Sequence, residues 1–229
     1  MAIPSRPPKL YSYEPLVIND SAGTDSESPV NKAAILLAGL GLLVLVSGTA
    51  LYTLLGARSA CDGSSAVGAT IGGPFELVDR AGGLVTDSDV LNRPALVYFG
   101  YTFCPDVCPF DMARNALAAD LLAEQGHDIA VVFISVDPER DTPEVLGQYA
   151  DDMYPQMTAL TGSAEQVKAA ANAYRAYYAK GEGSGEFYLV DHSTFTYLMF
   201  PGNELGTYFR REDTAEEIAE ATACLVGQS

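Results

Sequence analysis

Basic residues are scarce in this sequence. Only 13 of its 229 residues are Lys or Arg, against 30 Asp or Glu, which gives a formal net charge of −17 at pH 7. Binding of nucleic acid requires clustered Lys and Arg side chains that neutralise phosphates, and the sequence contains no such cluster. The composition therefore argues against a nucleic-acid partner. It favours a solvated acidic surface that can attract basic partners or cations.

Cysteine and histidine are also few, with four and two residues. Two of the cysteines, Cys104 and Cys108, follow an apolar run, Ala95–Gly100, that is typical of a buried strand. On a helix, this spacing would place the two Cβ atoms about 5–6 Å apart. The start of a helix also favours thiolate over thiol. The pair can therefore hold a soft metal or carry out thiol–disulfide exchange, with a purely structural pair as the alternative.

One of the two histidines completes a candidate metal site. His192 follows Asp191 at the end of an apolar segment far downstream of the cysteines, so only the fold can bring it near them. Two sulfur ligands and one imidazole nitrogen suit copper, whereas structural zinc normally has four protein ligands. Taken alone, a histidine in this place is more often a core residue. Asp191 is a candidate to orient the imidazole, with stabilisation of its loop as the alternative role.

A long uncharged segment precedes the cysteines. Residues Ala33–Leu55 contain no charged side chain, and as a helix they would extend about 34 Å, enough for a hydrocarbon core of about 30 Å. A signal peptide is the alternative, but its apolar core is usually shorter, about 7–15 residues. We therefore predict a single transmembrane helix. Arg6, Lys9 and Lys32 precede it and Arg58 follows it, which places the N-terminus in the cytoplasm by the positive-inside rule.

Composition divides the chain into four parts. Residues 1–32 combine prolines with polar and acidic residues, which predicts a disordered cytoplasmic tail. Residues 33–55 are the predicted transmembrane helix, residues 56–70 form a tether of small residues, and residues 71–229 are the folded domain. The acidic tail differs from an Arg-rich mitochondrial transit peptide. We therefore expect a bacterial inner (cytoplasmic) membrane protein with this domain in the periplasm, and the mitochondrial inner membrane is the alternative.

Strand and helix patterns alternate along the folded domain. This order predicts an α/β fold with a thioredoxin-like mixed sheet flanked by helices. A flexible loop is expected over Gly181–Glu186. The predicted strands are Phe75–Val78, Leu84–Thr86, Ala95–Gly100, Ile129–Val136, Phe187–Val190, Thr194–Phe200 and Leu205–Phe209. The predicted helices run from the cysteines to about Glu124, onward from Thr142-Pro143, over Ser163–Ala179, and over Asp213–Leu225.

Four segments in this order resemble the Sco/SenC family, which consists of membrane-anchored copper-handling proteins with a thioredoxin-like domain. The similarity extends from about Val67 to Ala223, and the combination of segments is far more specific than any one of them. The segments are FGYTFCPDVCP (Phe99–Pro109), SVDPERDTPE (Ser135–Glu144), LTGS (Leu160–Ser163) and YLVDHSTFTYL (Tyr188–Leu198).

The resemblance implies a site and a role. By resemblance, Cys104, Cys108 and His192 are the ligands of copper, as Cu(I) or Cu(II). The implied role is a metallochaperone, rather than an enzyme, that assists assembly of the CuA centre in the copper-bearing subunit of a respiratory haem-copper oxidase. Other periplasmic copper chaperones are then expected partners. Two alternatives remain: a thiol–disulfide oxidoreductase in which Cys104 and Cys108 reduce the acceptor's cysteines, and a redox or copper sensor.

Five further residues remain to be interpreted. Asp137, Arg140 and Asp141 belong to the second family segment, and we expect them to shape the loop after the preceding strand. Cys61 and Cys224 lie near the two ends of the folded domain and outside the implied copper site. An oxidising compartment permits a disulfide, and chain ends in compact domains often lie close together. A Cys61–Cys224 disulfide is therefore a hypothesis.

Overall fold

The computed structural model describes residues 35, 37, 40, 41, 43–45, 47–49, 71–184 and 187–227. The chain divides into two compact units, residues 1–51 and 52–229. The described residues of the first unit are helical, and among all the described residues no helix is both long and apolar enough to cross a membrane. The predicted tail and tether, and most of the predicted transmembrane helix, lie outside the described residues. The predicted transmembrane helix therefore stays a prediction.

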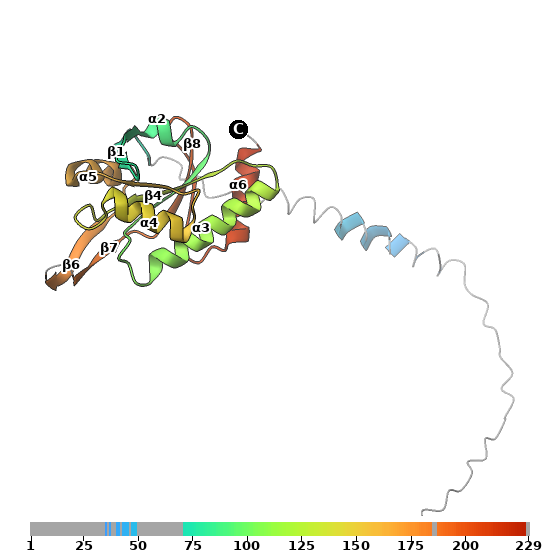
Figure 1. The fold of residues 1–229 in the computed structure, drawn as a ribbon. Coiled ribbons are helices and arrows are strands. Elements are labelled where there is room, and N and C mark those ends of the chain that lie inside the picture. Colours follow the sequence, from blue (N-terminus) through green and yellow to red (C-terminus); the bar gives the residue numbers. More distant parts are fainter. Residues whose placement is uncertain are drawn as a thin grey trace, which may run out of the picture. The chain divides into compact units, whose positions relative to one another are not determined.

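A seven-stranded mixed sheet forms the centre of the second unit, in the order β2-β1-β5-β4-β3-β8-β9 (Figure 1). The strands β3, β4 and β5 run parallel, and the strands on either side of them pair antiparallel. Their bounds are β1 Glu76–Asp79, β2 Leu84–Thr86, β3 Ala95–Gly100, β4 Ala130–Ser135, β5 Thr158–Thr161, β8 Thr196–Phe200 and β9 Glu204–Phe209. The short strand β5 was not predicted from the sequence, but the mixed sheet was, and the structure confirms it.

Helices bury the central strands. Every residue of β3 and β4 is buried, as expected for continuous apolar runs in the parallel part of a covered sheet. One apolar cluster joins Leu96 of β3 to Leu122 of α3 and Ile218 of α6, so these two helices pack against the sheet together. The helices are α2 Asp87–Val90, α3 Val107–Glu124, α4 Pro143–Met153, α5 Ala164–Ala173 and α6 Ala215–Val226.

Side chains cap the helix at two of the predicted helix starts. The Thr142 hydroxyl accepts a hydrogen bond from the Val145 N–H, with Pro143 in the first turn of α4. Ser163 and Gln166 form a reciprocal capping box at the start of α5. These contacts satisfy backbone N–H groups that have no partner within the helix, which is why the two starts could be located from the sequence.

The end of α5 was predicted wrongly. This helix stops at Ala173, because Arg175 adopts a left-handed backbone conformation with a φ of 52°. The end of the predicted helix, Tyr178 and Ala179, and most of the predicted loop Gly181–Glu186 belong instead to a strand, β6 (Tyr178–Ser184). Helices usually end this way at glycine, so an arginine in the position gave no signal in the sequence.

Strand β6 pairs antiparallel with β7 (Phe187–His192) in a separate two-stranded sheet. The pairing is irregular between Lys180 and Gly183. A Cβ atom added at Gly183 would lie only 2.2 Å from the Phe187 carbonyl oxygen, so glycine permits this close approach. The hairpin matters for function because His192 is its last residue.

Gly100, at the end of β3, provides a test of the packing beneath the cysteines. A Cβ atom there would lie 2.9 Å from each of three groups, the Cys108 Sγ and the rings of Phe133 and Tyr98. We expect Gly100→Ala to lower the free energy of unfolding by about 1–3 kcal/mol through overpacking, measured by denaturant unfolding of the metal-free protein.

The matched control is Gly147→Ala, in the interior of α4. Its added Cβ would approach its nearest neighbour, the Arg80 Cβ, only to 3.9 Å. We expect this substitution to raise the free energy of unfolding by about 0.5–1 kcal/mol, because glycine in a helix interior is less stable than alanine. Equal stability changes for the two variants would contradict the described packing around Gly100.

Candidate metal centre

The structure brings Cys104, Cys108 and His192 together. Cys104 lies in the loop after β3, Cys108 lies in the first turn of α3, and His192 ends β7. Their ligand atoms all lie within 4.8 Å of one another, and the Cys108 Sγ is 3.4 Å from the His192 Nε2. The two cysteines are buried and the histidine is half-buried. Three side chains from three segments thus form one compact sulfur and nitrogen cluster.

The two cysteines do not share a helical turn. Helix α3 begins at Val107, so Cys108 is helical and Cys104 precedes the helix. The Cys108 N–H donates to the Cys104 Sγ at 3.4 Å, and the Cys104 N–H donates to the Tyr101 carbonyl at 3.3 Å. The Cys104 sulfur therefore accepts from a backbone N–H at the helix start, where the helix dipole favours a negative charge.

The two thiols differ in acidity. The pKa of the Cys104 thiol is lowered well below its ordinary value, mainly because the Cys108 side chain donates a hydrogen bond to it. The backbone N–H groups of Cys108 and Asp106 lower it further. That same side-chain hydrogen bond, together with burial, raises the pKa of Cys108. The metal-free pair consequently contains one thiolate, Cys104, and one thiol, Cys108.

The His192 ring is oriented by a backbone carbonyl. Its Nδ1 lies 2.9 Å from the Ser193 carbonyl oxygen, which can only accept, so Nδ1 carries the proton. In the neutral ring this leaves the Nε2 lone pair directed at the cysteines. Asp191, the candidate from the sequence, is exposed on the other face of β7, because side chains alternate along a strand. The hydrogen bond that orients the imidazole is therefore accepted by the Ser193 carbonyl and not, as predicted, by the Asp191 carboxylate.

Aromatic and polar side chains enclose the cluster. The rings of Tyr98 and Tyr101 meet the His192 ring edge-on, with centroids at 6.1 and 5.7 Å. The Tyr98 hydroxyl donates to Asp111 at 2.9 Å, and burial raises the pKa of both groups. The sequence analysis missed Asp111, although its position one turn after Cys108 could have indicated it. This enclosure fixes the imidazole from two sides.

The loop after β4 connects to the cysteine loop. Asp141 is fully buried and accepts hydrogen bonds from the Thr102 N–H at 3.0 Å, the Thr102 hydroxyl at 2.6 Å and the Ser135 hydroxyl at 2.5 Å. Burial raises the pKa of this carboxyl group, and the three donors oppose that rise. Asp141 therefore fixes the backbone two residues before Cys104. The expectation from the sequence was that it shapes only its own loop, after the preceding strand.

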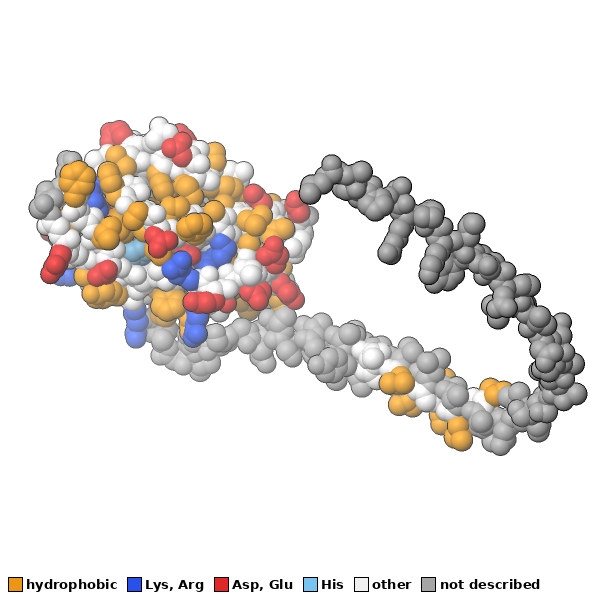
Figure 2. Space-filling view, turned by 90° about the horizontal axis from the view of Figure 1, so that it is seen from below, with side chains coloured by type: hydrophobic (Ala, Val, Ile, Leu, Met, Phe, Trp, Pro, Cys, Tyr) orange, Lys and Arg blue, Asp and Glu red, His pale blue; other side chains and the backbone are white. Residues whose placement is uncertain are grey.

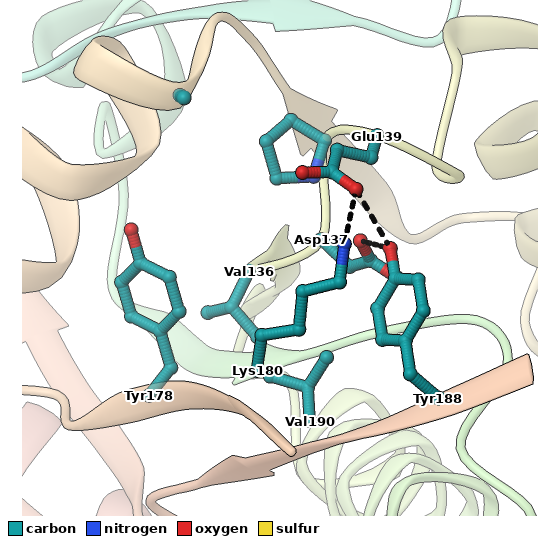
Figure 3. Close-up of a pocket in the computed structure, with 9 residues that line it drawn as sticks. Val136, Asp137, Glu139, Tyr178, Lys180, Tyr188 and Val190 are labelled. Atoms are coloured by element: carbon teal, nitrogen blue, oxygen red, sulfur yellow. Dashed lines mark hydrogen bonds and ion pairs between the residues drawn. The ribbon is translucent and has the colours of Figure 1, made fainter. Parts of the chain in front are cut away.

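The same loop also contacts the hairpin that carries His192. The Tyr188 hydroxyl donates to Asp137 at 2.6 Å, and Lys180 pairs with Glu139 at 2.5 Å (Figure 3). Figure 3 shows these four side chains converging from the loop and the hairpin across a small hollow. Asp137 and Asp141 thus link one loop to both ligand-bearing segments.

Among the described residues, Cys224 is not part of this cluster. Cys224 lies on α6, whereas Cys104 and Cys108 are free thiols of the candidate site. Cys61 lies outside the described residues, so its predicted pairing with Cys224 stays a prediction. The remaining histidine, His127, is half-buried in the loop after α3. It is not part of the cluster.

Acidic and hydrophobic side chains are interspersed on the face shown in Figure 2. Several exposed apolar side chains are close to the candidate site in sequence: Phe103, next to Cys104, is 53% exposed, and Leu189 and Phe187 of β7 are 55% and 87% exposed. Exposed apolar residues thus neighbour the candidate ligands in sequence, and those of β7 lie on the strand face opposite to His192.

Comparison with known proteins assigns the family. The family model described as SCO1/SenC matches residues 63–227. Protein SenC of Rhodobacter capsulatus is 48% identical over 201 residues, covering 86% of this chain and 91% of that protein. The mitochondrial SCO1 homolog 1 of Arabidopsis thaliana is 40% identical over 160 residues, covering 69% of this chain and 48% of that protein. The chain thus spans about half the length of the plant relative.

Solved structures agree with this assignment. The crystal structure of Arabidopsis thaliana ScoI with copper bound superposes with a TM-score of 0.67 at 38% identity, covering 69% of this chain and 99% of that one. Together with the observed mixed sheet, this similarity confirms the predicted thioredoxin-like α/β fold. The class is therefore a thioredoxin-like domain with a cysteine, cysteine and histidine cluster. The chain belongs to the SCO1/SenC family.

The inequality of the two thiols can be tested by alkylation with iodoacetamide, followed by peptide mapping across pH. Below an ordinary thiol pKa of about 8.5, the rate should fall about tenfold per pH unit. We expect the rate at Cys104 to hold nearly constant down to pH 6, because its lowered pKa keeps it a thiolate, while Cys108 stays unmodified.

Two variants check the cause of this inequality. Cys108→Ala removes the largest hydrogen bond to the Cys104 sulfur, so the pH profile of Cys104 should move to higher pH. Cys108→Ser keeps a donor at that position and should restore most of the profile. An ordinary thiol profile at Cys104 in the wild-type protein would contradict the described hydrogen bonding.

Proposed function

We propose that this chain is a membrane-anchored copper chaperone that binds Cu(I) and Cu(II) through Cys104, Cys108 and His192. Its role is to assist assembly of the CuA centre in a respiratory haem-copper oxidase. One observation carries the proposal: two sulfurs and an imidazole nitrogen, from segments far apart in sequence, lie within 4.8 Å of one another. The SCO1/SenC family of this chain and the copper-bound structure of a relative support copper as the cargo.

The donor set suits transient binding of copper. Two thiolates are soft ligands that favour Cu(I), and an imidazole also accommodates Cu(II). A site with three protein ligands stays open to an incoming ligand from an acceptor protein. Cys104 is already a thiolate, so only Cys108 must lose a proton when the metal binds.

The anchor and the location form part of the proposal. The uncharged segment 33–55 is long enough to span a membrane, and its described apolar side chains, among them Leu37 and Leu43, are 70% and 69% exposed. Such side chains require an apolar environment. With the N-terminus in the cytoplasm of a bacterium, the copper-binding domain faces the periplasm. There it can contact the oxidase subunit and other copper chaperones.

A second candidate function is supported by the thiol pair itself. A thiolate with a neighbouring thiol is the arrangement of a dithiol reductant, which would reduce the acceptor's cysteines so that they can take up metal. Exchange between thiol and disulfide does not require His192, whereas copper binding does. The histidine therefore discriminates between the two functions.

Copper titration tests the leading proposal. In residues 66–229, we expect Cys104→Ala and Cys108→Ala to reduce Cu(I) affinity by more than about 100-fold, because each removes a ligand; loss of a supporting residue costs about 10–100-fold. His192→Ala should weaken Cu(II) binding most and remove nitrogen coupling from the EPR spectrum. Affinity is measured by competition with a chelator of known strength.

The control is His127→Ala, which removes the other histidine of the chain and should leave binding unchanged. Weak binding by the wild-type protein, or equal binding by all variants, would refute copper handling at this site. In cells that depend on this protein, normal oxidase assembly with His192→Ala would favour the reductase instead.

A further inference from the structure

The position of His192 depends on a hairpin that lies outside the main sheet. Strands β6 and β7 hydrogen-bond to each other in their own two-stranded sheet. Ser193, the residue after His192, closes the base of this hairpin, because its N–H donates to the Tyr177 carbonyl at 2.8 Å. Ladder hydrogen bonds thus fix the shape of the hairpin. Side-chain contacts must fix its placement against the rest of the domain.

Arg140 makes a concentrated set of these contacts on the hairpin residue Tyr188. Its Nη1 donates to the Tyr188 carbonyl at 2.9 Å, and its guanidinium carbon lies 3.6 Å from the centre of the Tyr188 ring. Its Nε donates to Asp137. Figure 3 shows that the same carboxylate also accepts from the Tyr188 hydroxyl. The Arg140 and Asp137 side chains are only 9% and 4% exposed, so these charged hydrogen bonds are poorly screened by water.

Arg140 also faces the cysteine loop. Its guanidinium carbon lies 4.8 Å from the centre of the Phe103 ring and 5.6 Å from that of Tyr101. Phe103 directly precedes Cys104, and the Tyr101 ring contacts the ring of His192. One planar cation is therefore placed between the segment that carries the cysteines and the hairpin that carries the histidine. A guanidinium can stack on rings while it donates hydrogen bonds, which a lysine ammonium cannot reproduce.

The cysteines have supports that do not involve Arg140. Asp141 binds the backbone and the hydroxyl of Thr102, and the Cys108 N–H binds the Cys104 sulfur. Removing the guanidinium should therefore loosen the hairpin and leave the cysteine pair in place.

We propose that Arg140 is a positioning residue for the metal centre: it fixes the β6–β7 hairpin against the cysteine loop and so presents the His192 Nε2 to the two sulfurs. The inference rests on the proposed copper function and adds a residue that is not itself a ligand. It predicts that a substitution at Arg140 changes the copper affinity only by displacing His192.

The test is Arg140→Lys, which keeps a cation beside Asp137 but loses the planar fork. We expect copper affinity to fall by about 10–100-fold, as for the loss of a supporting residue, with weaker nitrogen coupling in the Cu(II) EPR spectrum. In the His192→Ala background, the same substitution should have no further effect, because the group it positions is gone. The control, Arg80→Lys, changes an arginine that pairs with Asp151 at 2.8 Å and should leave binding unchanged.

A metal-free measurement accompanies the titration. Hydrogen exchange should be faster in β6 and β7 of Arg140→Lys, with unchanged protection in β3 and β4. If that variant does not fold, Tyr188→Phe replaces it. This second variant keeps the ring beneath the guanidinium, removes only the hydroxyl that donates to Asp137, and should show a smaller effect in the same direction.

Each outcome decides the inference. Wild-type affinity and nitrogen coupling in Arg140→Lys would overturn it while leaving the copper function intact. Equal losses in the wild-type and His192→Ala backgrounds would also overturn it, since Arg140 would then act on the cysteines. Failure of the wild-type protein to bind copper would remove both the inference and the proposed function.

Discussion

The parallel pairing of β3 with β4 is the constraint on which the candidate site depends. Its register places Gly100 opposite Ser135, so the cysteine loop and the loop after β4 leave the sheet side by side. Both strands are buried along their full length, and this fixes the starting points of the two loops. Asp141 can then reach the backbone of Thr102. The site is built at the carboxyl ends of parallel strands, the usual position in open α/β sheets.

The three candidate ligands differ in how firmly the fold holds them. Cys108 belongs to a helix packed on the sheet, and Cys104 is held by the hydrogen bonds around that helix start. His192 belongs to a hairpin placed mainly by side chains, including Arg140 and Tyr188. A centre with two rigid sulfurs and one nitrogen on a separable element suits a protein that must release its cargo, because coordination can be reduced to two ligands without disturbing the sheet.

Prediction from sequence succeeded where a pattern has a direct physical cause. The bounds of β3 were predicted correctly, since a short continuous apolar run is typical of a buried strand. Prediction failed where tertiary contacts decide, as at Arg175, whose left-handed conformation ends α5 without a glycine. The convergence of His192 on the cysteines was expected by family resemblance, but its orientation by the Ser193 carbonyl was not, because backbone acceptors leave no mark in a sequence.

The burial of the two thiols bears on the choice between functions. Cys108 is completely buried and Cys104 is 7% exposed, so a protein substrate meets only the outer sulfur. Thiol–disulfide exchange can begin with that sulfur alone. It leaves unexplained why a ring nitrogen, with its tautomer fixed by a carbonyl, lies 3.4 Å from the inner sulfur. A small soft cation between the three groups would use every one of these features, and on that ground the arrangement favours copper binding over reduction.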